Sequence, residues 1–140
     1  MIVERIKELE SSDRQFRIRC AEELGDLLEY GTAPVSELEI VAGSLINAIC
    51  READSESREV LTNTLAILAS RNIGLKAPWE RLAAVLPQLD KGSLENALCA
   101  IGFSRDRNLA KFLGEYQRHS DEAVRGVAGN ALLELNVTKQ

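Results

Sequence analysis

Apolar residues recur three or four positions apart along most of this chain, which is the spacing of helices that bury one face. The same order of residues returns in three segments, 12–27, 54–68 and 120–135. When the segments are aligned, the following sets coincide: Arg17, Arg58 and Arg125; Cys20, Leu61 and Ala128; Leu24, Leu65 and Leu132. A pattern that returns every few dozen residues is typical of stacked supersecondary units, so we expect a helical solenoid.

The periodicity predicts eight helices. We expect them at about 2–9, 13–30, 36–51, 54–71, 78–87, 92–103, 104–116 and 121–135. Short polar or glycine-containing segments separate them, so helices that follow each other are expected to be antiparallel neighbours.

Polar residues and prolines predict where these helices begin and end. The sequence suggests two capping boxes, Ser12 with Gln15 and Ser36 with Glu39, and a further cap at Ser104. Pro78 fits a first helical position because that position has no use for an N–H, and Pro87 is expected to end or kink the same helix.

The helices form four pairs whose second members begin near Asp13, Asp54, Asp90 and Asp121. These starts lie 41, 36 and 31 residues apart, which suits two-helix repeats. We therefore predict one all-α domain over residues 1–140, an α-α superhelix. On the second helix we expect an inward stripe of Phe16, Cys20, Leu24 and Leu27, and on the last we expect Leu132 in the core.

The segment D-x-x-V-R-x-x-A-x-x-A-L-x-x-L at 121–135 resembles the second helix of HEAT-like repeats, including a short bacterial variety related to bilin-lyase repeats. The resemblance implies that Arg17, Arg58 and Arg125 tie neighbouring repeats together through carboxylates or carbonyls. It also implies that second helices line a concave face where partners dock. Leu94 departs from the pattern because it stands where the other copies carry arginine.

Charge is distributed unevenly along the chain. Residues 1–60 carry 14 acidic and 7 basic side chains, a net charge of −7, whereas residues 61–140 carry 8 and 10, a net charge of +2. Such a field favours an oppositely charged partner and opposes binding of the acidic half to a phosphate backbone. The chain has no membrane-length apolar run and no secretory signal, so we expect a cytoplasmic protein with three unpaired cysteines.

Acidic residues recur on one side of two predicted second helices. If those helices stack, the two groups would merge into one negative surface, although a charged helix face is also the ordinary solvated surface of a globular protein. As the residues of a partner-binding surface we predict Glu22, Glu23, Asp26, Glu29, Glu56, Glu59 and Asn63.

Residues for catalysis or for a cofactor do not group in the sequence. His119 is the only histidine and precedes a helix start, where capping suits it better than catalysis. The cysteines are too widely spaced for a zinc site, and no phosphate-binding glycine motif occurs. A basic group, Arg105, Arg107, Lys111 and Arg118, fits a solvated surface better than a nucleic-acid site, and Trp79 fits the core. We therefore expect no enzyme, metal or cofactor.

Three functions fit these observations. The first is a protein-binding module, most concretely an immunity protein whose acidic surface neutralises a basic toxin such as a nuclease. The chain resembles immunity proteins of contact-dependent growth inhibition in size, acidity and helical make-up. The second is a scaffold or adaptor subunit of a larger bacterial assembly, and the third is an enzyme related to bilin lyases.

Overall fold

The protein is a stack of helices in a computed structural model that describes residues 2–137. No strand occurs within those residues. The elements, including three short 3₁₀ helices labelled η, are α1 (Ile2–Arg5), η1 (Ile6–Glu10), α2 (Arg14–Tyr30), α3 (Val35–Arg51), α4 (Ser55–Arg71), α5 (Trp79–Val85), η2 (Leu86–Gln88), α6 (Lys91–Phe103), η3 (Arg107–Leu109), α7 (Ala110–Tyr116) and α8 (Glu122–Leu135).

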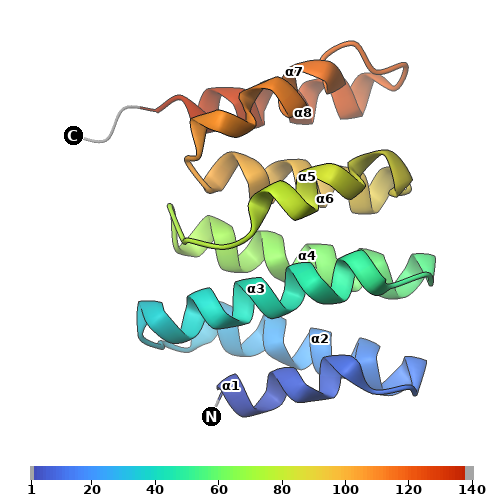
Figure 1. The fold of residues 1–140 in the computed structure, drawn as a ribbon, viewed down its shortest axis with the longest axis vertical. Helices are drawn as coiled ribbons and strands as arrows, with labels where there is room; N and C mark the ends of the chain where they lie inside the picture. Colours follow the sequence, from blue (N-terminus) through green and yellow to red (C-terminus); the bar gives the residue numbers. More distant parts are fainter. Residues whose placement is uncertain (1, 138–140) are drawn as a thin grey trace.

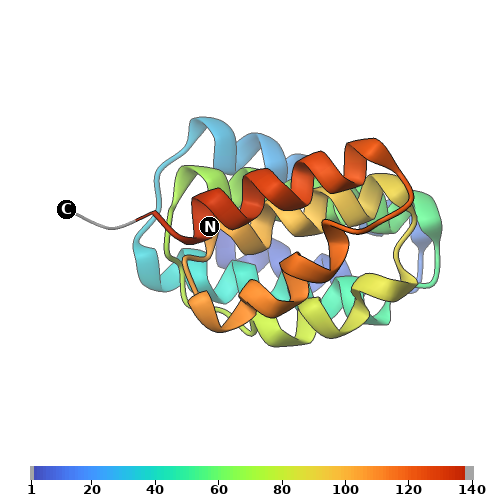
Figure 2. The same cartoon turned by 90° about the horizontal axis from the view of Figure 1, so that it is seen from above.

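The helices form two rows, and the rows lie against each other (Figures 1 and 2). One row holds the second helix of each pair, in which α2 packs on α4, α4 on α6 and α6 on α8. The other row holds α1 with η1, then α3, α5 and α7. We call each antiparallel pair a unit, so that unit 1 ends with α2 and unit 4 with α8. The predicted all-α superhelix of four pairs is confirmed.

Aspartates begin the second helices. Asp13, Asp54 and Asp121 each accept hydrogen bonds from backbone N–H groups of the first turn, which would otherwise lack a partner. Asp90 occupies the same position before α6 but makes no such bond. The four starts that the sequence indicated are thus the positions of the helix caps.

The serine caps that we predicted are wrong. The cap of α2 is Asp13 instead of Ser12, since its carboxylate lies at 2.9 Å from the N of Gln15. Helix α3 begins at Val35, one residue before Ser36. Its N-cap residue is Pro34, and no side chain caps it. Ser104 ends α6 instead of opening α7.

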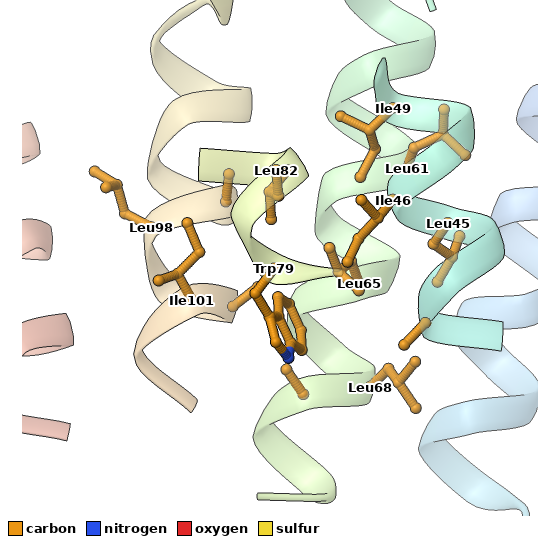
Figure 3. Packing of buried hydrophobic residues seen from close by; sticks show 14 of the residues in the cluster. Leu45, Ile46, Ile49, Leu61, Leu65, Leu68, Trp79, Leu82, Leu98 and Ile101 are labelled. Carbon is orange, nitrogen blue, oxygen red and sulfur yellow. The ribbon is translucent and has the colours of Figure 1, made fainter. Parts of the chain in front are cut away.

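The core lies between the two rows and runs through all four units. Figure 3 shows the part of it between α3, α4, α5 and α6. Trp79 is 3% exposed, and its indole Nε1 donates to the carbonyl of Leu75 at 2.9 Å, so the large ring is buried without an unpaired donor. Around it lie side chains of α3, α4 and α6, including Ile46, Leu65 and Ile101 (Figure 3). The assignment of Trp79 to the core is confirmed.

The predicted inward stripes are wrong at the ends of the stack. Phe16 and Leu27 on α2 are 40% and 42% exposed, whereas Leu28 is buried. Leu132 on α8 is only partly buried, although its counterpart Leu65 is fully enclosed. Because α2 and α8 each lack a neighbour on one side in the row of second helices, positions that are buried inside the stack are open to solvent there.

Two of the aligned arginines join neighbouring units. Arg17 donates from Nε and Nη2 to the carboxylate of Glu52 at 2.9 and 3.1 Å, and from Nη1 to the carbonyl of Ser11. Arg58 reaches the carbonyl of Gln88 at 3.3 Å. Arg125, which has no following unit, donates to carbonyls of its own loop.

A second set of contacts joins the starts of successive second helices. The residue after one aspartate donates to the next aspartate along the stack, as Arg14 does to Asp54 at 3.0 Å and Lys91 to Asp121 at 3.2 Å. Ser55 makes the same contact with Asp90. These bonds lower the pKa of Asp54, mainly through Arg14, and of Asp121, through the N–H of Val124 and then Lys91. The four helix starts therefore form one continuous ladder, which we call the aspartate ladder.

Candidate functional site: an acidic groove between α2 and α4

Helix α2 supplies three of the predicted acidic residues. Glu22, Asp26 and Glu29 lie four and three residues apart, so they share one face of the helix. Leu24 and Leu28 bury the opposite side against the core. The buried leucines therefore fix which way the carboxylates point.

Helix α4 supplies Glu56, Glu59 and Asn63 and lies close beside α2. Thr64 is 2% exposed, and its Oγ1 donates to the carbonyl of Ala21 at 2.8 Å. Gly25 faces this contact, where an added Cβ would lie 3.5 Å from Thr64 Oγ1. Because both positions are small, the two helices approach closely and bring their acidic faces together.

The two faces form one groove of about 860 Å³. It brings together six of the seven predicted residues, Glu22, Asp26, Glu29, Glu56, Glu59 and Asn63. Its lining also includes Val60 and Ile67, which are partly buried apolar side chains. No lysine or arginine is among the described residues that line it. We call this feature the acidic groove.

The carboxylates of the groove are open to solvent. Glu22, Asp26, Glu56 and Glu59 are exposed, and Glu29 is half-buried. Among the residues that the structure describes, a cation holds only Glu56 of this set, through the ion pair with Arg14 on the neighbouring helix. Like charges therefore face one another across the groove with little internal compensation, which leaves their field free to act on an approaching molecule.

Glu23 is the predicted residue that the structure does not bring into the groove. Its carboxylate forms an ion pair with Arg5 of α1, on a different side of α2 from Glu22. Adjacent residues on a helix are about 100° apart, so Glu22 and Glu23 cannot share one face as the prediction assumed.

The groove also has residues that the sequence did not indicate. Asn96 of α6 lines it, and its Nδ2 lies within 3.3 Å of Thr62 Oγ1 and 3.4 Å of the Glu59 carbonyl. Gly92 lies beneath the Glu59 carboxylate, where a Cβ would collide with the side chain. Counting each second helix from its starting aspartate would have aligned Asn96 with Val60 and placed it on this face.

Other candidate residues serve the fold. Arg105 bonds to Glu134 of α8, so it is not available as part of a basic cluster, and Lys111 lies over the ring of Phe112. His119 accepts the N–H of Asp121 at its Nδ1 and stacks on Tyr116. This position at the start of α8 agrees with the predicted capping role.

The cysteines are separate thiols. Cys20 is buried, and burial raises the pKa of its thiol to about 12. Cys50 and Cys99 are half-buried, and burial also raises their pKa values. Raised pKa values keep all three in the poorly nucleophilic thiol form. Within residues 2–137, no three histidine, cysteine or acidic side chains group in a way that could hold a metal ion.

The fold of this chain is similar to that of known structures, whereas its sequence matches no known family. No protein-family profile and no curated protein matches the sequence. Two crystal structures of engineered proteins from the Northeast Structural Genomics Consortium are similar. One has a TM-score of 0.68 at 20% identity over 96% of this chain, and the other has 0.70 at 18% over 99%. The chain spans 62% and 38% of the lengths of those proteins. At such identities the likeness establishes the fold alone.

Among the described residues, no helix has the length and apolar character that crossing a bilayer requires.

Proposed function

We propose that this chain is a protein-binding module whose acidic groove receives a basic surface of its partner. The observation that carries the proposal is the merger of five carboxylates from α2 and α4 in one groove whose described lining holds no basic residue. An exposed acidic surface attracts a cationic partner over several ångströms and speeds its association at low salt.

The most concrete form of the proposal is an immunity protein that blocks a basic toxin such as a nuclease. A nuclease binds its substrate through a cationic surface, and the groove offers that surface carboxylates in place of phosphates. The rows of helices hold these carboxylates on a rigid frame, which reduces the ordering cost of binding. Inhibition then follows from occupation of the toxin's substrate site.

A matched pair of triple variants tests the role of the groove. In the groove variant, Glu22→Lys, Asp26→Lys and Glu29→Lys reverse three charges on α2. In the control variant, Glu37→Lys, Glu80→Lys and Glu115→Lys make the same change in net charge on α3, α5 and α7, in the other row of helices. Both variants remain folded, which circular dichroism checks.

The readout is capture of a basic protein from the native cell by each immobilised chain, followed by titration of the purified partner. We expect the original chain and the control variant to capture it with a Kd that weakens as salt rises, and the groove variant to lose binding by at least tenfold. Equal binding by the groove variant, or equal loss in the control variant, would contradict the proposal.

A second candidate function, an adaptor subunit, is favoured by exposed apolar side chains near the end of α2. Tyr30 is 83% exposed and Val35 60%, and they lie close in sequence to Leu27. Large exposed apolar side chains that gather in one region often mark an interface. Substitution of Tyr30 and Val35 by serine would abolish partner capture for an adaptor and leave it intact for binding through the groove.

A further inference from the structure

The contacts between second helices repeat from unit to unit, and they identify which positions must be small. Counting from each starting aspartate, the twelfth residue in units 1 and 3 faces the tenth residue of the next unit, Gly25 at Thr64 and Gly102 at Ala131. In units 1, 2 and 3 it is Gly25, Ala66 and Gly102. At Gly102 an added Cβ would lie 2.9 Å from both the Cα and the carbonyl oxygen of Ala131 in α8. A larger side chain there would collide with backbone, which cannot move aside as a flexible side chain can.

The last unit breaks this rule. Its twelfth residue is Leu133, which is 72% exposed. A following helix in the same register would meet the leucine where the three earlier units present glycine or alanine. Leu133 is therefore too large for the stack to continue beyond α8.

The aspartate ladder also ends at α8. The residue after each starting aspartate is Arg14, Ser55 and Lys91 in the first three units, and each donates to the aspartate of the next unit. In unit 4 this residue is Glu122. Placed against another aspartate, Glu122 would add a like-charge contact where the earlier units have a donor.

The first unit carries a matching change on its outer side. The tenth residue faces the preceding unit and is small in units 2, 3 and 4, as Thr64, Ala100 and Ala131. In unit 1 it is Glu23, which is held by Arg5. A helix stacked before α2 would have to displace this ion pair and bury the carboxylate at a position of close approach.

We infer that Glu23 at one end and Leu133 with Glu122 at the other close the stack, so that a second copy of this chain cannot extend it head to tail. The need for such closure follows from the fold. When every unit packs on the next in the same way, the two ends of a stack can bind further copies and form an open filament. Growth stops only if the residues at the ends differ from those between units.

The steric premise is tested by moving leucine between the two equivalent positions. Gly102→Leu places leucine inside the stack and is expected to lower the midpoint of urea unfolding sharply. Leu133→Ala removes it from the end and is expected to leave the midpoint nearly unchanged. A Gly102→Leu protein with the original midpoint would overturn the inference, because a leucine would then fit between units.

The assembly consequence is tested with a variant that has interior-type residues at both ends, Glu23→Thr, Glu122→Lys and Leu133→Gly. We expect its mass in sedimentation velocity to rise continuously with concentration, while the original chain forms no open-ended series of oligomers. A variant that keeps Glu23 and changes only the other two residues serves as control and does not polymerise.

Two results of the assembly experiment would count against the inference: head-to-tail growth of the original chain, or a folded variant with both ends changed that shows no growth. If that variant does not fold, the urea midpoints of Gly102→Leu and Leu133→Ala decide whether the inference stands. None of these measurements involves a binding partner, so they stand or fall independently of the acidic groove.

Discussion

Leu65 and Leu132 occupy aligned positions in the repeated pattern but differ in burial. Leu65 is fully enclosed between α4 and its neighbours, whereas Leu132 is partly open at the end of the stack. We expect Leu65→Ala to lower the free energy of unfolding by about 2–5 kcal/mol, because it leaves a cavity in a rigid core. The same change at Leu132 should cost clearly less, and urea melts of both variants measure the difference.

Leu133→Ala is the control for this comparison, since Leu133 is 72% exposed and its truncation removes little buried area. An equal loss at Leu65 and Leu132 would mean that α8 is covered in solution by something outside the described residues.

Burial at this scale could be predicted from the sequence only where another element covers the apolar face. The periodicity correctly selected Cys20 and Leu24 on α2 as core residues. It was wrong for Phe16 and Leu27 because helical spacing identifies a face of the helix and cannot say whether another helix covers that face.

At the scale of elements, the contact between Arg17 and Glu52 joins α2 to the loop before α4. The side chains are only 20% and 6% exposed. Burial alone raises the pKa of Glu52, but hydrogen bonds from Arg17, Ser57 and the N–H of Asp54, together with the charge of Arg17, lower it by more, so the net pKa lies below its usual range. Arg17→Gln should therefore lower the free energy of unfolding at neutral pH by about 1.5–3 kcal/mol, the range for hydrogen bonds to charged groups.

The effect should depend on pH with a definite sign. A carboxyl group whose folded pKa is lowered stabilises the fold above its unfolded pKa, and this stabilisation is lost as the pH falls through the folded value. The difference between the original chain and Arg17→Gln should thus shrink on acidification, as urea melts from neutral to acidic pH can measure. Arg51→Gln, which removes only an exposed contact to Glu10, should cost no more than about 0.5 kcal/mol.

Most elements could be predicted because their signals are local. The apolar spacing gave the eight helices, and the aspartates at 13, 54 and 121 gave three of their starts. The serine caps were wrong because a cap depends on which oxygen reaches the free N–H groups, and Asp13 reaches them where Ser12 does not. The sequence also gave no sign that α7 would be preceded by the 3₁₀ turn η3 and a left-handed Arg105 with φ of 58°.

At the scale of the whole molecule, the acidic groove should lower stability, because it gathers like charges. Glu22→Gln, Asp26→Asn and Glu29→Gln together should raise the free energy of unfolding at low salt by about 0.5–1 kcal/mol, since each like-charge pair one turn apart costs a few tenths. The gain should vanish at high salt, where these exposed charges are screened. Thermal melts at two salt concentrations measure it.

Glu80→Gln and Glu115→Gln provide the control, because both residues are exposed and lie on helices of the other row. A loss of stability in the groove variant would mean that its carboxylates make structural contacts instead of repelling one another.

The groove could be predicted in outline from two pieces of information, the spacing of acids on each helix and the expectation that second helices stack. Its third wall was missed because α6 carries a weak copy of the repeated pattern, although counting from Asp90 would have placed Asn96 there. Glu23 was misplaced because it is adjacent to Glu22 and so lies on another face of α2, where it pairs with Arg5, eighteen residues earlier in the chain. Contacts of this kind depend on the packing of one element against another, which spacing within one helix does not report.

The three cysteine thiols are natural probes of local unfolding in this molecule. Cys20, Cys50 and Cys99 lie in units 1, 2 and 3, and burial raises the pKa of each. A thiol reagent will therefore reach the buried Cys20 mainly when its surroundings transiently unfold, whereas the half-buried Cys50 and Cys99 can also react in the folded state. Timed alkylation followed by peptide mass analysis can thus report the local opening of unit 1 in the unmodified chain, without any introduced probe.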